Sequence, residues 1–364
     1  MPQRCLPGPG ELAALANVVR DELDEFRTLC GTPSFDESRF LALLQRHQLS
    51  GFVHASLDGR PARNLLSQHA RERLAGAFVH QWAINERLAC ELRRLTTLLA
   101  AEGCPFLLLK GLHLALAYYG SSDRRGFSDL DILVQPGDVE RAIALLERDG
   151  YRRRSRALFG RPVAARFTHA CELSRQDSTV DLHWAFVRHP AYRIDYEAVW
   201  STSREFDALG APVRVLGDEY ALTFQCLAML KDLELGTLRL KSLVDLYFLT
   251  FACEARIAWD PFLARCERER TLRSVTAALS LMSTLLGTRD LFPRLDRCLA
   301  SIAPIALPEG IATRLAACRR STTDRLWASR IQDPSRLRAA AWWAVSLPFR
   351  IAAHRPELAS RTAG

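Results

Sequence analysis

Two aspartates in a short apolar segment, Asp129 and Asp131, constrain this sequence more than any other feature. The rest of the segment 130–134 is leucine, isoleucine and valine, which favours a buried β-strand. Side chains alternate between the two faces of a strand, so both carboxylates project from the same face. Neighbouring negative charges repel, and a divalent cation that prefers oxygen ligands, such as Mg²⁺, compensates them. The triplet predicts either a metal site or a solvated strand end.

Basic residues precede these aspartates at positions suited to phosphate. Lys110 and Gly111 lie where the apolar run 105–109 gives way to helical spacing, which indicates a strand-to-helix turn. A glycine lets phosphate approach the backbone N–H groups there, and a helix N-terminus favours an anion. Arg124 and Arg125 lie in the polar loop that follows, either as phosphate ligands or as surface arginines. The alternative for Lys110 is a solvated lysine at a tight turn.

A third carboxylate, Asp181, occurs in the segment 179–184, Thr-Val-Asp-Leu-His-Trp. It shares a strand face with His183, while Val180 and Leu182 point the other way. Three carboxylates on adjacent strands suit two-metal phosphoryl or nucleotidyl transfer. The alternative is a buried structural acid that pairs with an arginine. His183 is interpreted as an orienting or structural residue, because magnesium prefers oxygen ligands.

These motifs, in this order, resemble an uncharacterised bacterial nucleotidyltransferase family that is distantly related to the DNA polymerase beta superfamily. The resemblance covers about residues 80–250. It rests on the Lys-Gly turn, the arginines, Ser-Asp-Leu-Asp-Ile-Leu-Val at 128–134 and Asp-Leu-His-Trp at 181–184. Arg239, Lys241 and Asp245 resemble a basic helix of the same family. The superfamily usually carries Gly-Ser at the turn that here is Lys110-Gly111.

The resemblance implies a mixed β-sheet core and transfer of a nucleoside monophosphate from an NTP, with ATP as the first candidate, to an unknown acceptor, with release of pyrophosphate. It implies that the catalytic and metal-ligating residues, for Mg²⁺ or Mn²⁺, are Asp129, Asp131 and Asp181. The implied nucleotide-binding residues are Lys110, Gly111, Arg124, Arg125 and Lys241.

Two other functions stay open at the level of sequence. One is a catalytically degenerate module that binds a nucleotide or a partner and is encoded in a biosynthetic gene cluster. The other is a toxin-type nucleotidyltransferase that modifies tRNA. A tRNA-modifying enzyme would need a basic surface beside its site. One run of arginines either provides such a surface or is a solvated loop: Arg148, Arg152, Arg153, Arg154 and Arg156.

Two helical positions are equally ambiguous. Lys241 and Asp245 are four residues apart, so they either pair on a helix surface or contact nucleotide or substrate. His113, just after the Lys-Gly turn, is interpreted as a partly exposed helical histidine, the alternative being a residue near phosphate.

Composition limits the partners and the location. The formal net charge is +8, but only three of the 49 basic residues are lysines, so the excess reflects arginine-rich coding as readily as nucleic-acid binding. A nucleic-acid partner is therefore not favoured. The ten cysteines form no CxxC pair, as expected for reduced thiols in the cytoplasm. No apolar stretch approaches the roughly 18 residues of a membrane span, so we expect a cytoplasmic protein.

The chain is expected to be an α+β protein with a helical region (1–102), a nucleotidyltransferase core (103–190) and a second helical region (191–364). Helical spacing predicts helices over 11–29, 40–49 and 68–101 in the first region. A hairpin is expected from strands at 166–173 and 179–184. If its turn is symmetric about Gln176, Asp181 lies opposite Cys171 and His183 opposite His169. Residues 212–216 are a further candidate strand.

Overall fold

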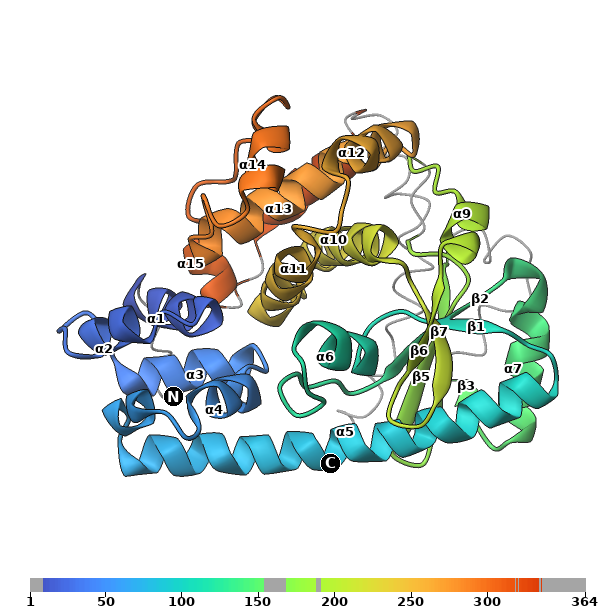
Figure 1. Cartoon of the computed structure of the whole chain (residues 1–364), viewed down its shortest axis with the longest axis horizontal. Coiled ribbons are helices and arrows are strands. Elements are labelled where there is room, and N and C mark those ends of the chain that lie inside the picture. The colour runs from blue at the N-terminus through green and yellow to red at the C-terminus, as the bar shows by residue number, and fades with distance from the viewer. Residues whose placement is uncertain are drawn as a thin grey trace.

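The computed structural model describes residues 9–153, 168–187, 191–317, 319, 321–333 and 335. A mixed β-sheet lies at one end of a largely helical molecule (Figure 1), so the predicted α+β class is confirmed. The elements before the sheet are α1 (Pro9–Arg20), α2 (Leu23–Cys30), α3 (Glu37–Arg46), α4 (Ser50–Leu57), the 3-10 helix η1 (Pro61–Leu65) and α5 (Gln68–Ala101).

The sheet has the strand order β3-β4-β5-β2-β1-β7-β6. Its strands are β1 (Phe106–Leu108), β2 (Leu130–Val134), β3 (Arg152–Arg153), β4 (Ala170–Arg175), β5 (Ser178–His183), β6 (Arg204–Asp207) and β7 (Pro212–Val215). β2 pairs with β5, and β1 with β7, in parallel, while the other neighbours are antiparallel. The two central strands, β1 and β2, are fully buried.

Helices also lie between and after the strands. Those within the sheet region are α6 (Leu112–Tyr118), the 3-10 helix η2 (Pro136–Asp138), α7 (Val139–Arg148) and α9 (Tyr196–Ser201). Those after it are α10 (Asp218–Leu235), α11 (Leu240–Cys253), α12 (Trp259–Arg268), α13 (Leu272–Leu286), α14 (Pro293–Leu299), α15 (Ile311–Ala316) and α16 (Thr322–Gln332). None of the helices in the described ranges is long and apolar enough to cross a membrane.

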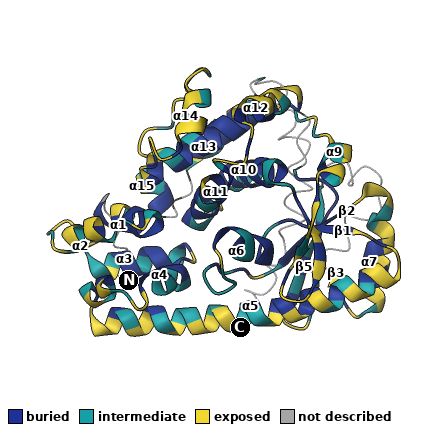
Figure 2. Cartoon of the chain, in the orientation of Figure 1, coloured by how far each residue is buried: buried dark blue, intermediate teal, exposed yellow. Residues whose placement is uncertain are grey.

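Two hydrophobic clusters hold the sheet and the helices together. Figure 2 colours the buried residues dark blue. One face of the sheet, with Leu108 and Ile132, packs against α7 and the C-terminal half of α5. The opposite face, with Leu107 and Leu133, belongs to the larger cluster, which includes α6, α10, α11 and α13. Because residues two apart share a strand face, Asp131 lies on the same face as Leu133. The acidic residue is thus directed toward the helices that follow the sheet.

Local chain chemistry explains where the observed elements depart from the predicted ones. The predicted helix 11–29 is two helices, because Asp21 adopts a positive φ of 63° that interrupts the helical backbone. The predicted helix 68–101 is observed as α5, whose N-cap Ser67 accepts a hydrogen bond from the Ala70 N–H. The candidate strand at 212–216 is β7. It extends the sheet beyond residue 190, the end proposed for the core.

The predicted hairpin register is wrong by one residue. Asp181 pairs with Glu172, and His183 with Ala170, rather than with Cys171 and His169. The turn consists of two residues, Gln176 and Asp177, so its centre lies between them. Gln176 has a φ of 51°, which suits a tight two-residue hairpin turn.

Candidate functional site

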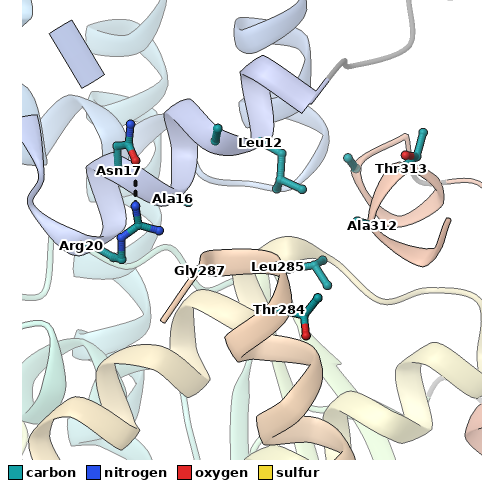
Figure 3. Close-up of a pocket in the computed structure, with 11 residues that line it drawn as sticks. Leu12, Ala16, Asn17, Arg20, Thr284, Leu285, Gly287, Ala312 and Thr313 are labelled. Atoms are coloured by element: carbon teal, nitrogen blue, oxygen red, sulfur yellow. Dashed lines mark hydrogen bonds between the residues drawn. The ribbon is translucent and has the colours of Figure 1, made fainter. Parts of the chain in front are cut away.

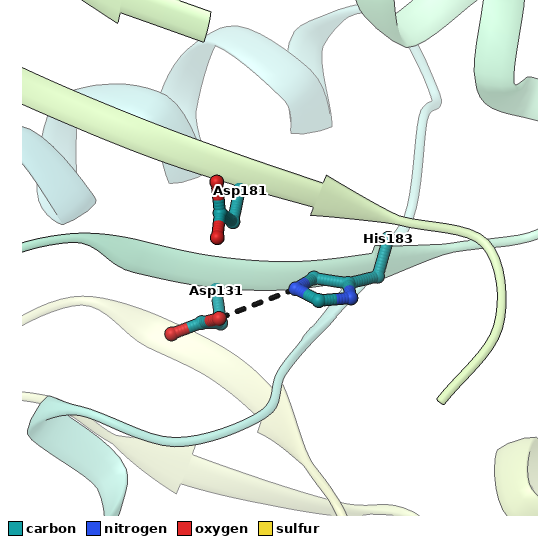
Figure 4. Close-up of side chains that lie close together, drawn as sticks. All are labelled: Asp131, Asp181 and His183. Carbon is teal, nitrogen blue, oxygen red and sulfur yellow. Dashed lines mark hydrogen bonds and ion pairs between the residues drawn. The ribbon is translucent and has the colours of Figure 1, made fainter. Parts of the chain in front are cut away.

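Asp131 and Asp181 occupy the same level of two neighbouring parallel strands, β2 and β5. Figure 4 shows both carboxylates and the His183 ring on one side of these strands. Each of the three residues offers a metal-ligating atom, and these atoms lie within 4.8 Å of one another. Asp131 Oδ1 lies 3.1 Å from Lys110 Nζ and 3.2 Å from His183 Nε2, while the buried Asp131 Oδ2 has no partner among the described residues.

Burial and the charges of neighbouring groups shift the pKa values of the three acids, Asp129, Asp131 and Asp181. Burial and the negative charge of Asp131 raise the pKa of Asp181 to about 6, and the same two causes raise the pKa of Asp129. Burial also opposes ionisation of Asp131, but Lys110 and His183 outweigh it and lower the pKa of that carboxyl. No cation pairs with Asp129 or Asp181 in the described chain. An oxygen-rich site with an orphaned carboxylate oxygen fits a divalent cation.

A cavity of about 270 Å³ opens beside these acids. It is bordered by β2, the loop before it, the Lys-Gly turn before α6, and by α10 and α11. Six of the predicted site residues line it: Lys110, Gly111, Arg125, Asp129, Asp131 and Lys241. Two predicted site residues are not in its lining, Arg124 and Asp181. Asp181 still adjoins Asp131 across the strand pair, whereas Arg124 lies in the preceding loop with a half-buried side chain.

Two lysines bring positive charge to this cavity. Burial disfavours the charged form of Lys110, but the carboxylates of Asp131 and Asp129 outweigh it and raise its pKa. Lys241 Nζ donates to Gln48 Oε1 at 2.9 Å and to the Gly126 carbonyl at 3.2 Å. Burial, followed by the charge of Arg125, lowers the pKa of Lys241 to about 8. Both ammonium groups can contact an anion in the cavity.

Arg125 forms a buried ion pair with Asp245 of α11. Its Nε and Nη2 donate to the two carboxylate oxygens at 2.6 and 2.8 Å, and both side chains are at most 5% exposed. Tyr119 donates to the same carboxylate at 2.7 Å, and Arg125 Nη1 donates to the Gly111 carbonyl at 3.4 Å. Arg125 is therefore not a surface arginine, and of the two alternatives for Lys241 and Asp245, the surface pair is wrong. The network fastens the Lys-Gly turn and the loop to α11.

Gly111 and His113 lie on either side of the start of α6. Gly111 has φ 68° and ψ −118°, a conformation that glycine adopts without strain, and it lines the cavity. His113 is completely buried between Tyr118 and Phe206, so the interpretation as a partly exposed histidine is wrong. Burial, and then the charge of Arg204, lower its pKa to about 3. No described group bonds to either ring nitrogen. It does not line the cavity.

Two residues on α5 that were not predicted from the sequence, Gln81 and Asn85, position the loop before β2. Asn85, 1% exposed, donates to the carbonyls of Ser122 and Arg125 and accepts from the Phe127 N–H. Gln81 donates to Asn85 and to the Phe127 carbonyl. Together they fix the loop that leads into β2. The only signal in the sequence is a pair of amide side chains four residues apart on an otherwise amphipathic helix.

A hollow of about 310 Å³ between α1, α13 and α15 (Figure 3) differs in character. Its lining contains no acidic residue, and Arg20 is the charged residue there. That guanidinium donates to Asn17, Glu22 and the Leu286 carbonyl, so its hydrogen bonds are already used within the chain. The acids and lysines around Asp131 are the better candidate for chemistry.

A mixed sheet that carries clustered acids beside basic residues can hold phosphate and a cation. Residues 33–287, about 70% of the chain, match the family model described as an uncharacterised nucleotidyltransferase. The chain belongs to this nucleotidyltransferase family. No curated protein matches it significantly.

Among solved structures, the solution structure of the antibiotic-resistance factor ANT(2'')-Ia is similar over 56% of this chain and 97% of that chain. The identity is 14% and the TM-score is 0.35. The likeness is slight.

Proposed function

We propose that this protein is a metal-dependent nucleotidyltransferase that moves a nucleoside monophosphate from an NTP, ATP being the first candidate, to a hydroxyl of an acceptor. The observation that carries the proposal is the set of acids on β2 and β5 beside a cavity lined by Lys110 and Lys241. Membership of a nucleotidyltransferase family supports the same reaction class.

The acids would hold Mg²⁺ or Mn²⁺ through Asp129, Asp131 and Asp181. The unpartnered Asp131 Oδ2 and the raised pKa values of the other two carboxyls support this assignment. The metal, when bound, supplies charge neutralisation at the triphosphate. His183, 3.2 Å from Asp131 Oδ1, would orient that carboxylate.

Each remaining side chain has a distinct part in the proposed reaction. Lys110 and Lys241 would bind phosphate oxygens, and Arg125 would keep Gly111 and the loop in place through Asp245. Asp181 would take the proton of the acceptor hydroxyl. The acceptor oxygen then bonds to the α-phosphorus as the bond from that phosphorus to the β-phosphate oxygen breaks, and pyrophosphate leaves. Positioning and charge stabilisation would provide the catalysis. The phosphate contact predicted for Arg124 stays a prediction.

Calorimetry with each NTP, with and without Mg²⁺, tests the binding step. We expect the wild type to bind at least one NTP in a metal-dependent manner and Asp131→Asn to lose this binding while its circular dichroism is unchanged. Asp123→Asn is the matched control, since it removes a carboxylate from the loop before β2 that does not line the cavity. If the wild type binds no NTP, the proposal fails.

Catalysis needs a second readout, because a degenerate module would bind nucleotide without turnover. Incubation of the protein with α-³²P-labelled NTP and a metabolite extract should produce labelled acceptor and unlabelled pyrophosphate. An Asp131→Asn variant as active as the wild type would overturn the proposed chemistry.

No described contact favours the tRNA-modifying alternative. Arg152 and Arg153 lie in β3, the edge strand that β4 and β5 separate from β2. Arg153 pairs with Glu147 at 2.8 Å. Arg154 and Arg156 lie outside the described residues.

A further inference from the structure

A second cavity, of about 350 Å³, adjoins the proposed nucleotide cavity. It lies between the C-terminal ends of α3, α10 and α15 and the segment that leads into α11. Thr237 and Arg239 line both cavities. A molecule held in the second cavity is therefore next to one held beside the acids.

Three arginines give the second cavity its charge: Arg46, Arg239 and Arg319. None of them forms an ion pair with a described residue. Arg239 and Arg319 are exposed, and Arg46 donates one hydrogen bond, to the Ala317 carbonyl at 3.3 Å. Charges of one sign that are gathered in a concave site attract counter-ions.

The acid in the lining of this cavity does not neutralise these arginines. Asp324, whose side chain is 3% exposed, accepts from Arg314 Nε at 2.8 Å and from Arg314 Nη2 at 2.5 Å. Both of its oxygens are thus already paired in a bidentate contact. The three guanidinium groups keep their positive charge for a ligand.

His47 connects the segments that carry the arginines. Its Nδ1 accepts from the Leu240 N–H at 3.1 Å, and its Nε2 lies 2.9 Å from the Ala316 carbonyl. These contacts hold the start of α11 and the end of α15, next to Arg239 and Arg319 respectively. Burial, and then the charges of Arg46 and Arg239, lower the pKa of His47 to about 4, in keeping with a positive potential at this place.

We propose that the cavity lined by Arg46, Arg239 and Arg319 is the acceptor site and binds a phosphate monoester group of the acceptor. The inference rests on the proposed nucleotidyl transfer. A planar guanidinium group can bind two phosphate oxygens at once through two parallel N–H···O bonds. Three uncompensated positive charges match a phosphate monoester, which is a dianion, better than a phosphodiester, which carries one negative charge. The wall shared through Thr237 and Arg239 lets the acceptor hydroxyl reach the acids while its phosphate stays among the arginines.

Equilibrium dialysis with ³²P-labelled inorganic phosphate tests this assignment on the full chain. The protein is first saturated with Mg²⁺ and a non-hydrolysable ATP analogue, so that the nucleotide cavity is filled. We expect one phosphate to bind, Arg319→Gln to weaken it at least tenfold, and Arg46→Gln to act in the same direction. Arg289→Gln, which removes an exposed arginine outside the cavity, should leave phosphate affinity unchanged.

Competition defines the ligand class. Methyl phosphate, a monoester, should displace the labelled phosphate, whereas dimethyl phosphate, a diester, should not. Equal displacement by the two, equal phosphate binding by Arg319→Gln and the wild type, or no phosphate binding at all would each overturn the assignment. The affinity for the ATP analogue is read separately. If the analogue binds and phosphate does not, the acceptor site alone fails; if the analogue itself does not bind, the proposed function fails, and the acceptor role fails with it.

Discussion

Replacing Asp245 by asparagine should destabilise the protein strongly, because it leaves the Arg125 guanidinium buried without a counter-charge. The two side chains are 5% and 3% exposed, so water cannot take over the lost contact. Removal of one partner from a buried pair costs about 3–5 kcal/mol of folding free energy, or roughly 10²- to 10⁴-fold in the unfolding equilibrium. Asparagine keeps one acceptor oxygen, so we expect a value near the lower end of this range.

Urea unfolding at pH 7, followed by circular dichroism, measures this loss. The matched control is Asp177→Asn, because that carboxylate is 83% exposed and lies 3.9 Å from Arg87. It should cost less than about 1 kcal/mol. The double replacement Arg125→Met with Asp245→Leu removes both charges and should be more stable than Asp245→Asn. A loss of folding free energy below about 1 kcal/mol for Asp245→Asn would refute the view that this replacement leaves Arg125 as an uncompensated buried charge.

The same pair has a defined pH dependence. Burial opposes ionisation of Asp245, but Arg125 outweighs it and lowers the pKa of this carboxyl below its ordinary value. A carboxyl with a lower pKa in the folded state stabilises the fold above the unfolded pKa of about 3.9, and this stability is lost as the pH falls through the folded pKa. The difference in stability between the wild type and Asp245→Asn should therefore shrink as the pH is lowered below about 4. A constant difference would contradict the assignment.

Three further outcomes are expected. Asn85→Ala leaves buried groups of the 122–127 loop unpaired, so we expect a loss of about 1–3 kcal/mol and faster hydrogen exchange in that loop; unchanged exchange would contradict the positioning role. NTP affinity should fall as the pH rises through about 8, because Lys241 loses its charge there; the charged groups around it are Arg125, Asp245, Asp129 and Lys110. The variant Lys241→Arg should keep its NTP affinity at pH 9; an equal fall in both proteins would exclude Lys241 as the titrating group. Gly111→Ala meets no atom closer than 3.6 Å, so its cost in thermal unfolding should come from backbone strain alone, about 1–3 kcal/mol; a negligible cost would contradict this.

The parts of the fold set by local pattern could be predicted from the sequence. The long periodic run after Ser67 matches α5 at both ends, and the apolar runs around 105–109 and 130–134 match β1 and β2. Local pattern failed where one residue's backbone decided the outcome. Asp21 and Gln176 both have positive φ values, and neither residue type indicates a positive φ as strongly as glycine does.

The candidate site was predictable in its residue types but not in its contacts. Alternation along a strand predicted that Asp129 and Asp131 share a face; Asp129 lies just before β2, and both residues line the cavity. The parallel pairing of β2 with β5 brings Asp181 beside Asp131. The partner of Arg125, by contrast, is Asp245, 120 positions further along the chain. Nothing near Arg125 in sequence distinguishes it from Arg124. Only the contact of the loop with Asp245 of α11 reveals that Arg125 is buried, whereas Arg124 is half-buried.

The 34-residue helix α5 has a consequence for how this chain can be divided into fragments. At about 50 Å in length, it carries Ala70 and Leu74 into one hydrophobic cluster and Leu88 to Leu99 into the other. A fragment that begins at residue 103 would lack the helix that covers Leu108 and Ile132, and would expose that apolar face to aggregation. A fragment that contains the acids and keeps this face covered therefore has to include the C-terminal half of α5, from before Leu88 onward.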